Sequence, residues 1–283
     1  MDGKWHHQIS HTHNANNLMM NTDLSNRPRL SIGILTKNEE RLIGECVRSA
    51  LFADEVVLLD SGSTDNTLTI AQSLGAKTFV SDDWQGFAVQ RNRLLSHVTG
   101  EYIFFLDADE IITPELRDEI MSAVENKELA VWKVMWTVVA YGHTLHHFKS
   151  KTSMERLFPR NLIDRYEGVV HEEAILTKKS VTRHTLRHRL LHHSRQSIKA
   201  SLEKLTQYAM LGAAKRHARG MRGGVWRGIA SASASFLRTY IWQRGILDGG
   251  PGFLYCHFIA LECFFRYVAL KYDESLLTPD IKR

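Results

Sequence analysis

The stretch that most constrains the fold is an apolar run, residues 102–106, that leads into Asp107-Ala108-Asp109-Glu110. An apolar run bounded by Gly100 and these acids predicts a strand buried on both faces, as in a mostly parallel sheet. Such a strand ends in the crevice where open α/β sheets bind ligands. Asp107 and Asp109 would share a face of a continuing strand, and their oxygens suit Mg²⁺ or Mn²⁺ bound together with substrate phosphates. The pattern predicts a metal-diphosphate site; the alternative is a solvated acidic loop.

Strands and helices are expected to alternate through residues 29–126. Short connections between alternating elements require right-handed crossovers, so the predicted fold is α/β, with a mostly parallel sheet and helices on both faces. Its carboxyl edge would collect Thr36, Asp60 and the acids at 107–109. The glycine-rich loops of dinucleotide-binding oxidoreductases and P-loop enzymes do not follow the predicted strands. The expected strands are 30–36, 55–60 and 77–80, and the expected helices are 40–52, 70–74, 84–97 and 113–126.

Charge is distributed unevenly along the 283 residues, which carry a net charge of +5. Residues 178–283 hold 19 Lys+Arg and 6 Asp+Glu, a balance of 19 − 6 = +13, so the preceding residues have 17 basic and 25 acidic residues, or −8. The basic part favours an anionic partner: nucleic acid, acidic lipid or phosphorylated glycan. Three scattered cysteines do not form a disulfide or zinc-finger pattern, which favours a reducing cytoplasm.

The two ends of the chain differ from its centre. Residues 1–27 lack periodicity and an apolar signal-peptide core, so we expect a disordered leader there. A catalytic domain is expected at 28–195 and a basic, aromatic-rich helical tail at 196–283. Within the tail, Gly249-Gly250-Pro251-Gly252 is expected to break the chain. The residues that follow, 253–270, are apolar but hold charges at 262 and 266, which makes them a poor transmembrane span and a better interfacial helix. The alternative is a tail that packs on the catalytic domain or on a second subunit.

Motifs in a fixed order resemble the family 2 glycosyltransferases with the GT-A fold. The resemblance spans about residues 29–195, and the set of motifs is more specific for the family than for the substrate. The family motifs are Leu35-Thr36-Lys37-Asn38-Glu39, Asp60-Ser61-Gly62-Ser63-Thr64-Asp65, Gln90-Arg91-Asn92 and Asp107-Ala108-Asp109. The stretches that resemble the branch adding glucose to the lipopolysaccharide inner core are Asp83-Trp84-Gln85-Gly86-Phe87, Arg156-Leu157-Phe158 and Val170-His171-Glu172.

The resemblance implies an inverting, metal-dependent hexosyltransferase. The expected donor is a UDP-sugar, with glucose as the expected hexose, and the expected acceptor is a heptose of the lipopolysaccharide inner core. Mg²⁺ or Mn²⁺ would be held by Asp109 as principal ligand, together with Asp107. The enzyme would be cytoplasmic and peripheral at the inner membrane, where the basic tail meets an anionic surface; nucleic acid is not an expected partner.

The resemblance also implies roles for residues near the nucleotide. Thr36 and Glu39 would lie near the base, and Asp60 would contact the uracil or ribose side. Arg91 would lie near the nucleotide, and Asp107 would contact the ribose or the metal. From the residues alone, Asp60 could instead be a helix-capping or turn acid, and Arg91 could lie on a solvated helix face.

An inverting transfer needs a carboxylate that deprotonates the acceptor hydroxyl. In similar enzymes the Glu after Val-His occupies this position, so Glu172 is the expected base; Glu173 is the near competitor and Glu167 a distant one. His171 and His193 are candidate diphosphate contacts, and a packed histidine without a chemical role is the alternative for His171.

Other functions fit the pattern less well. A phosphatase with an Asp-x-Asp nucleophile should carry this motif after its first strand, and a nucleotidyltransferase should carry a glycine-rich loop there. A structural zinc site at His143, His146 and His147 is not expected, because cysteines are lacking nearby and lysines flank the histidines. The remaining alternatives are transfer to another glycan or lipid-linked acceptor, and a non-enzymatic protein that binds anionic polymers.

Overall fold

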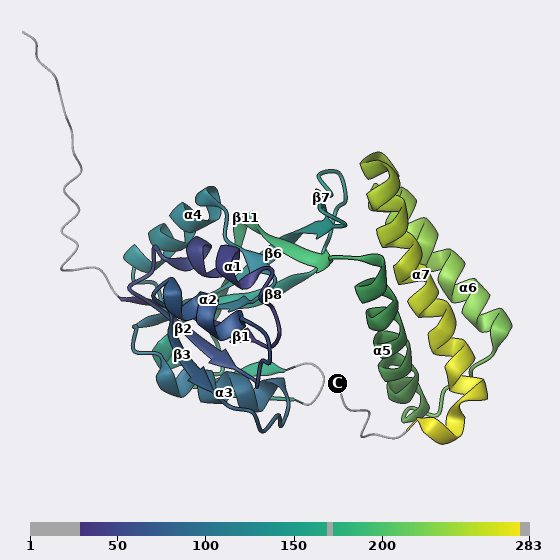
Figure 1. Ribbon diagram of the computed structural model, residues 1–283, viewed down its shortest axis with the longest axis horizontal. Coiled ribbons are helices and arrows are strands. Elements are labelled where there is room, and N and C mark those ends of the chain that lie inside the picture. Colours follow the sequence, from purple (N-terminus) through teal and green to yellow (C-terminus); the bar gives the residue numbers. More distant parts are fainter. Residues whose placement is uncertain (1–28, 169–171, 278–283) are drawn as a thin grey trace, which may run out of the picture.

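The fold combines one large mixed sheet with a layer of three helices, α5 (Ile198–His217), α6 (Val225–Phe236) and α7 (Gly249–Tyr272) (Figure 1). The computed structural model describes residues 29–168 and 172–277. The sheet runs in the order β3-β2-β1-β4-β8-β6-β11-β5, with β7 paired to β6.

The first half of the sheet is parallel. It consists of β1 (Leu30–Thr36), β2 (Glu55–Asp60), β3 (Lys77–Val80) and β4 (Tyr102–Asp107). Parallel pairing joins β1 to both β2 and β4, and β2 to β3. The four predicted strands are confirmed. β1, β2 and β4 are buried on both faces and therefore leave a continuous apolar signature in the sequence, whereas β3 is partly exposed.

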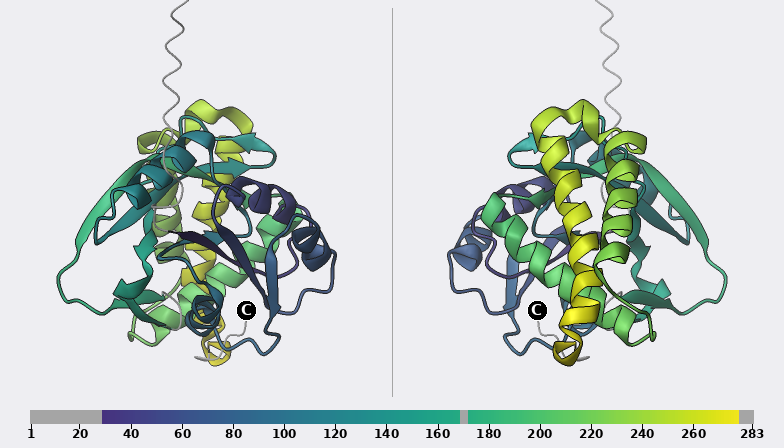
Figure 2. Two further views of the ribbon diagram at one scale, coloured as in Figure 1. Left: turned by 90° about the vertical axis from the view of Figure 1, so that its left-hand side faces the viewer. Right: turned by 90° about the vertical axis from the view of Figure 1, so that its right-hand side faces the viewer.

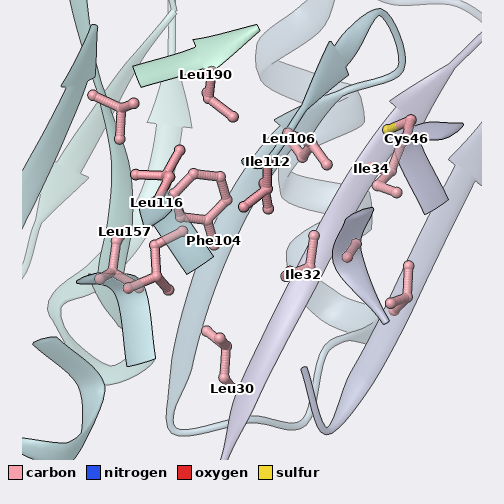
Figure 3. Close-up of a cluster of buried hydrophobic side chains, with 14 of the residues drawn as sticks. Leu30, Ile32, Ile34, Cys46, Phe104, Leu106, Ile112, Leu116, Leu157 and Leu190 are labelled. Carbon is pink, nitrogen blue, oxygen red and sulfur yellow. The ribbon is translucent and has the colours of Figure 1, made fainter. Parts of the chain in front are cut away.

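Helices cover both faces of this half. Residues of α1 (Ile43–Ala50), α2 (Thr67–Ser73) and α4 (Pro114–Glu125) share one apolar core with β1, β2 and β4. Figure 3 shows part of this core, in which Cys46 and Leu116 are drawn with Ile34 and Phe104. Residues of α3 (Phe87–His97) belong to a second core on the other face. The predicted α/β class with helices on both faces is therefore confirmed.

The second half of the sheet is mixed. It contains β6 (Ala130–Ala140), β8 (Ser153–Pro159) and β11 (Thr182–Arg195), with the short strands β5 (Glu110–Ile111) and β7 (His143–Thr144). Strand β8 runs antiparallel to both β4 and β6, whereas β11 runs parallel to β6. Because β8 pairs directly with β4, its side chains come within reach of the acids that follow β4. A separate two-stranded antiparallel sheet of β9 (Ile163–Glu167) and β10 (Glu173–Leu176) follows β8 after the 3₁₀ turn η1 (Arg160–Leu162).

The helical layer follows β11. The Ser197 side chain caps α5 by accepting a hydrogen bond from Ala200 N at 3.1 Å. Residues 249–252, expected to break the chain, form the first turn of α7, a position that tolerates proline. By length and composition, one helical stretch in the described part of the chain could cross a membrane, residues 245–272, and one third of its apolar window is buried. The connecting segments are the π-helical η2 (Leu237–Trp242), η3 (Gly245–Asp248) and η4 (Glu274–Leu276).

Candidate active site

The carboxyl ends of three parallel strands bring the predicted nucleotide-site residues to one edge of the sheet. Thr36 of β1 lies opposite Asp60 of β2, and Leu35 of β1 lies opposite Asp107 of β4. Thr36 is buried, and its hydroxyl has no hydrogen-bond partner among the described residues. A buried hydroxyl without a partner is costly, so this atom is free to bond to a ligand at the edge.

Asp60 shapes the loop that follows β2. It is fully buried, and its Oδ2 accepts hydrogen bonds from the backbone N of Gly62 at 2.9 Å and of Ser63 at 2.7 Å. Its Oδ1 accepts from Ser63 Oγ at 2.5 Å. These contacts are those of a turn acid, and the predicted contact with a nucleotide stays a prediction.

Two buried arginines hold Asp107. Nη2 of Arg156 lies 2.6 Å from Asp107 Oδ2, and Nη2 of Arg91 lies 3.3 Å from Oδ1. Burial disfavours the charged carboxylate, but Arg156 and Arg91 outweigh it and hold the pKa of Asp107 well below its usual range. Arg91 is only 4% exposed and its guanidinium stacks on Phe105 and Tyr166, so the alternative of a solvated helix face was wrong.

Glu110 completes this network under the sheet edge. Its Oε1 accepts hydrogen bonds from Arg156 Nη2 at 2.7 Å and from Trp136 Nε1 at 2.6 Å, and its Oε2 accepts from Asp107 N at 3.0 Å. Burial raises the pKa of Glu110 to about 7. Arg156 is 1% exposed, and its Nε and Nη1 lack hydrogen-bond partners within the described part of the chain. The network fixes the position of Asp107 from both its side chain and its backbone.

Whereas Asp107 is paired with two arginines, Asp109 is paired with a histidine. Its carboxylate is 20% exposed and lies 3.4 Å from His192 Nε2. Its backbone carbonyl accepts a hydrogen bond from His193 N at 2.9 Å. Burial opposes protonation of His192, but the hydrogen bond to Asp109 outweighs it and raises the histidine pKa. Burial lowers the pKa of His193, which lines a cavity of about 160 Å³ together with Arg41 and other residues.

The predicted base lies beside the acids of β4. Arg91 Nε lies 3.3 Å from Oε1 of Glu172, whose side chain is 13% exposed, so Arg91 stands between Glu172 and Asp107. Glu173 is exposed in β10, and Glu167 is exposed and bonds to Arg165 at 2.7 Å. His171 and the leader at 1–27 lie outside the described residues. Among the three candidate glutamates, Glu172 is the one joined to the Asp107 network in the described structure.

Glu39 faces the Asp109 side of the edge. Burial and then the nearby charge of Asp109 raise the pKa of Glu39. Gln196 Nε2 donates a hydrogen bond to Glu39 Oε2 at 3.4 Å and also lines the cavity beside His193. Glu39 therefore links the first strand's loop to the segment after β11.

The acids fit a divalent ion that is shared with a substrate. Both carboxylates are partly exposed, but two arginines already neutralise Asp107, which leaves Asp109 as the better ligand for a cation. No group of three or more His, Cys, Asp and Glu side chains suited to a metal ion occurs in residues 29–168 and 172–277. Mg²⁺ commonly binds one or two carboxylates and completes its shell with substrate phosphates and water, which matches this donor set.

Similarity to known proteins adds to this geometry. Residues 31–182 match the family described as Glycosyl transferase family 2. The chain belongs to this family. The predicted membership and the predicted GT-A fold class are confirmed, and the chain is a glycosyltransferase rather than a non-enzymatic binder of anionic polymers.

Several relatives cover most of this family 2 chain. It is 28% identical over 265 residues to the lipopolysaccharide core biosynthesis glycosyltransferase LpsC of Rhizobium meliloti, covering 86% of this chain and 94% of the relative. An uncharacterised glycosyltransferase of Rickettsia felis is 26% identical over an alignment that covers 88% of this chain and 91% of the relative. Among solved structures, glucosyl-3-phosphoglycerate synthase from Mycobacterium tuberculosis in complex with phosphoglyceric acid is 19% identical, with a TM-score of 0.45. The match covers 64% of this chain and 75% of that protein's chain.

Three residues at the site were not predicted: Glu110, Arg156 and His192. Glu110 was visible as the third acid after the apolar run, and Arg156 as the charged residue that begins the Arg156-Leu157-Phe158 motif. Their buried contact depends on the antiparallel pairing of β8 with β4, which local periodicity does not specify.

Proposed function

We propose that this glycosyltransferase inverts the anomeric carbon as it transfers a hexose, glucose, from a UDP-sugar to a heptose of the lipopolysaccharide inner core. The observation that carries the proposal is the position of Arg91, which joins Glu172 to Asp107 at the carboxyl edge of the sheet. The similarity to a lipopolysaccharide core glycosyltransferase over 94% of that protein's length supports the acceptor class.

In the proposed reaction, Glu172 accepts the proton of the acceptor hydroxyl. The acceptor oxygen then forms its bond to the anomeric carbon while the bond from that carbon to the diphosphate breaks, and UDP leaves with the electron pair. Mg²⁺ or Mn²⁺ held by Asp109 with the substrate would neutralise the charge that develops on the leaving diphosphate. Arg91 contacts both the proposed base, Glu172, and Asp107 on the donor side, and would hold both carboxylates in position.

The remaining side chains at the edge would bind the nucleotide-sugar. Thr36, Asp60 and Glu39 would contact the nucleoside, and Asp107 would contact the ribose or the metal. The free hydroxyl of Thr36 supports this assignment, because it is buried and still has bonding capacity. His193 would contact the diphosphate, which its backbone bond to Asp109 supports.

The enzyme would act at the cytoplasmic face of the inner membrane. Its catalytic domain would comprise residues 28–195 and its membrane-associated tail residues 196–283. The basic charge of the tail and the long apolar helix α7 support peripheral association. A different glycan or lipid-linked acceptor is the second candidate, because similarity at 28% identity fixes the acceptor less firmly than the family.

Calorimetric titration with UDP-, GDP- and ADP-sugars, with and without Mn²⁺, tests the donor and the metal. We expect UDP-glucose to bind, and Mn²⁺ to tighten binding in the wild type but not in Asp109→Asn. Asp118→Asn, a matched change of an exposed acid on α4, should behave as the wild type. Equal binding of all three nucleotide classes, or the same Mn²⁺ response in Asp109→Asn, would contradict the proposal.

A further inference from the structure

An apolar groove of about 800 Å³ runs between α6 and α7. Its walls include Ile229 and Leu237 on one side and Phe253 and Phe264 on the other. Ser233 and His257 are the polar members of the described lining, and charged side chains are absent from it. Eight residues separate Ile229 from Leu237, so this wall extends for roughly 12 Å at the rise of a helix.

The groove faces away from the catalytic domain. Glu262 forms a buried ion pair with Arg195 at the end of β11, so that side of α7 faces the sheet. Because successive helical residues are about 100° apart, Glu262 lies about half a turn around α7 from Phe253 and Phe264. The right-hand view of Figure 2 shows α6 and α7 side by side at the front of this outer face.

The outer helices also expose aromatic and basic side chains. Trp226 and Trp242, near the two ends of the α6–η2 segment, are 82% and 81% exposed. Exposed tryptophans are typical of the boundary between lipid and water. Exposed cations lie in or next to the same elements, where they could meet anionic headgroups. These cations are Arg222, Arg227, Arg238, Arg244 and Lys271.

We propose that this outer face lies flat on an anionic phospholipid bilayer and that the groove between α6 and α7 binds one acyl chain. The apolar lining of the groove would contact the acyl chain, and the exposed cations of the same helices would attract an anionic headgroup. The groove is roughly 12 Å long, which would hold most of one acyl chain, because a chain that spans the hydrocarbon of one leaflet is about 15 Å long. The inference adds a lipid site to the proposed function and rests on it only for the location of the acceptor.

A bilayer suits this face better than two other arrangements. A membrane-spanning α7 would have to give up the Arg195–Glu262 pair or place it in hydrocarbon, which is unfavourable. In a symmetric dimer through the same face, the cations beside the groove would meet their own copies, and like charges oppose such contact.

Flotation of the full-length protein with vesicles, in the absence of donor and acceptor, measures membrane binding directly. We expect binding to phosphatidylglycerol-containing vesicles that weakens with salt, and little binding to phosphatidylcholine vesicles. Each of Arg222→Gln and Arg238→Gln should weaken binding about fivefold. Equal binding to both vesicle types, or no binding at low salt, would overturn the proposal.

Substitution inside the groove separates the acyl-chain site from general charge attraction. Leu237→Glu should weaken vesicle binding about tenfold or more, because a leucine that would contact the acyl chain is replaced by a charge. Leu129→Glu is the matched control: Leu129 is 50% exposed on the catalytic domain and Leu237 is 52% exposed. Both variants should melt at the wild-type temperature and bind UDP-sugar normally, so a failed lipid result stays distinct from a failed donor assignment.

A phospholipid with a photoreactive acyl chain locates the site. Peptides from residues 229–237 and 253–264 should carry the label in the wild type and lose it in Leu237→Glu. Label confined to α5 or to the catalytic domain would reject the groove. A shift in oligomeric state by Leu237→Glu in sedimentation velocity, without a change in flotation, would reject the lipid in favour of a second copy of the chain.

Discussion

At the scale of single residues, Arg91 connects the two chemical tasks of the site. Its guanidinium contacts Glu172 with one nitrogen and Asp107 with another, and it is held by Phe105 and Tyr166. The planar guanidinium presents its donors in a fixed fork, so one arginine can orient both carboxylates at once. The proposed base and the proposed donor site are therefore positioned by one side chain.

Replacing Glu172 with glutamine tests the base. Glu172→Gln should lower kcat by about a hundredfold to ten-thousandfold, because the amide cannot take the acceptor proton. UDP-sugar affinity measured by calorimetry should remain, because glutamine keeps the shape of the side chain.

The neighbouring acid supplies the control for this experiment. Glu173→Gln, at an exposed position in β10, should retain activity close to that of the wild type. An active Glu172→Gln enzyme, or an inactive Glu173→Gln enzyme with Glu172 intact, would reassign the base.

Sequence patterns locate some site residues better than others. Thr36, Asp60 and Asp107 end strands whose apolar runs are plain in the sequence, so their shared edge could be predicted. The burial of Arg156 and Glu110 could not be predicted in this way, because it depends on the pairing of β8 with β4. Arg156 of β8 lies 49 residues after Asp107 in the sequence. Contacts of that kind are set by tertiary packing rather than by local periodicity.

At the scale of elements, hydrogen bonds to Glu55 connect the start of β2 to β1, to β3 and to the loop before β4. Its carboxylate accepts hydrogen bonds from Ser31 Oγ at 2.5 Å, Lys77 Nζ at 2.9 Å and Thr99 Oγ1 at 2.9 Å. Burial opposes the charged form, but the bonds from Ser31, Thr99 and Lys77 outweigh it and lower the pKa of Glu55 to about 2. The carboxylate thus joins three strands' ends and the loop before β4.

This depressed pKa predicts a pH-dependent contribution to stability. The stabilisation is fully present above the ordinary glutamate value of 4.5 and is lost as pH falls towards about 2. Glu55→Gln should therefore lower the free energy of unfolding by about 2–3 kcal/mol at pH 7, and the gap to the wild type should narrow between pH 4.5 and 2. Urea denaturation at pH 7 and at pH 3 measures both values.

An exposed glutamate gives the reference for this change. Glu125→Gln, at the end of α4, should alter the free energy of unfolding by less than about 0.5 kcal/mol. A gap between Glu55→Gln and the wild type that stays constant from pH 7 to pH 3 would show that the hydrogen bonds do not depend on the carboxylate charge.

Elements were predicted well where one local signal dominates. The apolar runs of β1, β2 and β4 follow from burial on two faces. The Thr113-Pro114 start of α4 follows from capping, because Thr113 Oγ1 accepts a hydrogen bond from Leu116 N at 3.3 Å. The predicted start of α7 was wrong, because the glycines and proline at 249–252 were expected to interrupt the chain, whereas the helix begins at Gly249. Proline fits a helix's first turn, so composition alone did not place that boundary.

At the scale of the whole molecule, the helical layer is joined to the sheet through Arg195 and Glu262. Both residues are buried, and Arg195 Nη1 also donates to the carbonyl of Ser201 at 3.2 Å. Removing one partner of a buried pair leaves an uncompensated charge, which costs more than removing both.

A pair of substitutions tests this junction. Glu262→Ala should lower the free energy of unfolding by about 3–5 kcal/mol, measured by urea denaturation. The double variant Arg195→Met/Glu262→Leu should lose less, because it leaves no buried charge. Equal losses in the single and double variants would mean that the junction depends on packing instead of charge.

The thickness of the helical layer would set the height of the catalytic domain above the membrane. With α6 and α7 resting on a bilayer, the helical layer would hold the catalytic domain off the headgroups by at least one helix diameter, roughly 10 Å (Figure 1). A sugar attached directly to a lipid would remain beneath this height, whereas a sugar further out on the same glycan would reach it. The fold would thereby choose its acceptor by distance from the membrane as well as by chemistry.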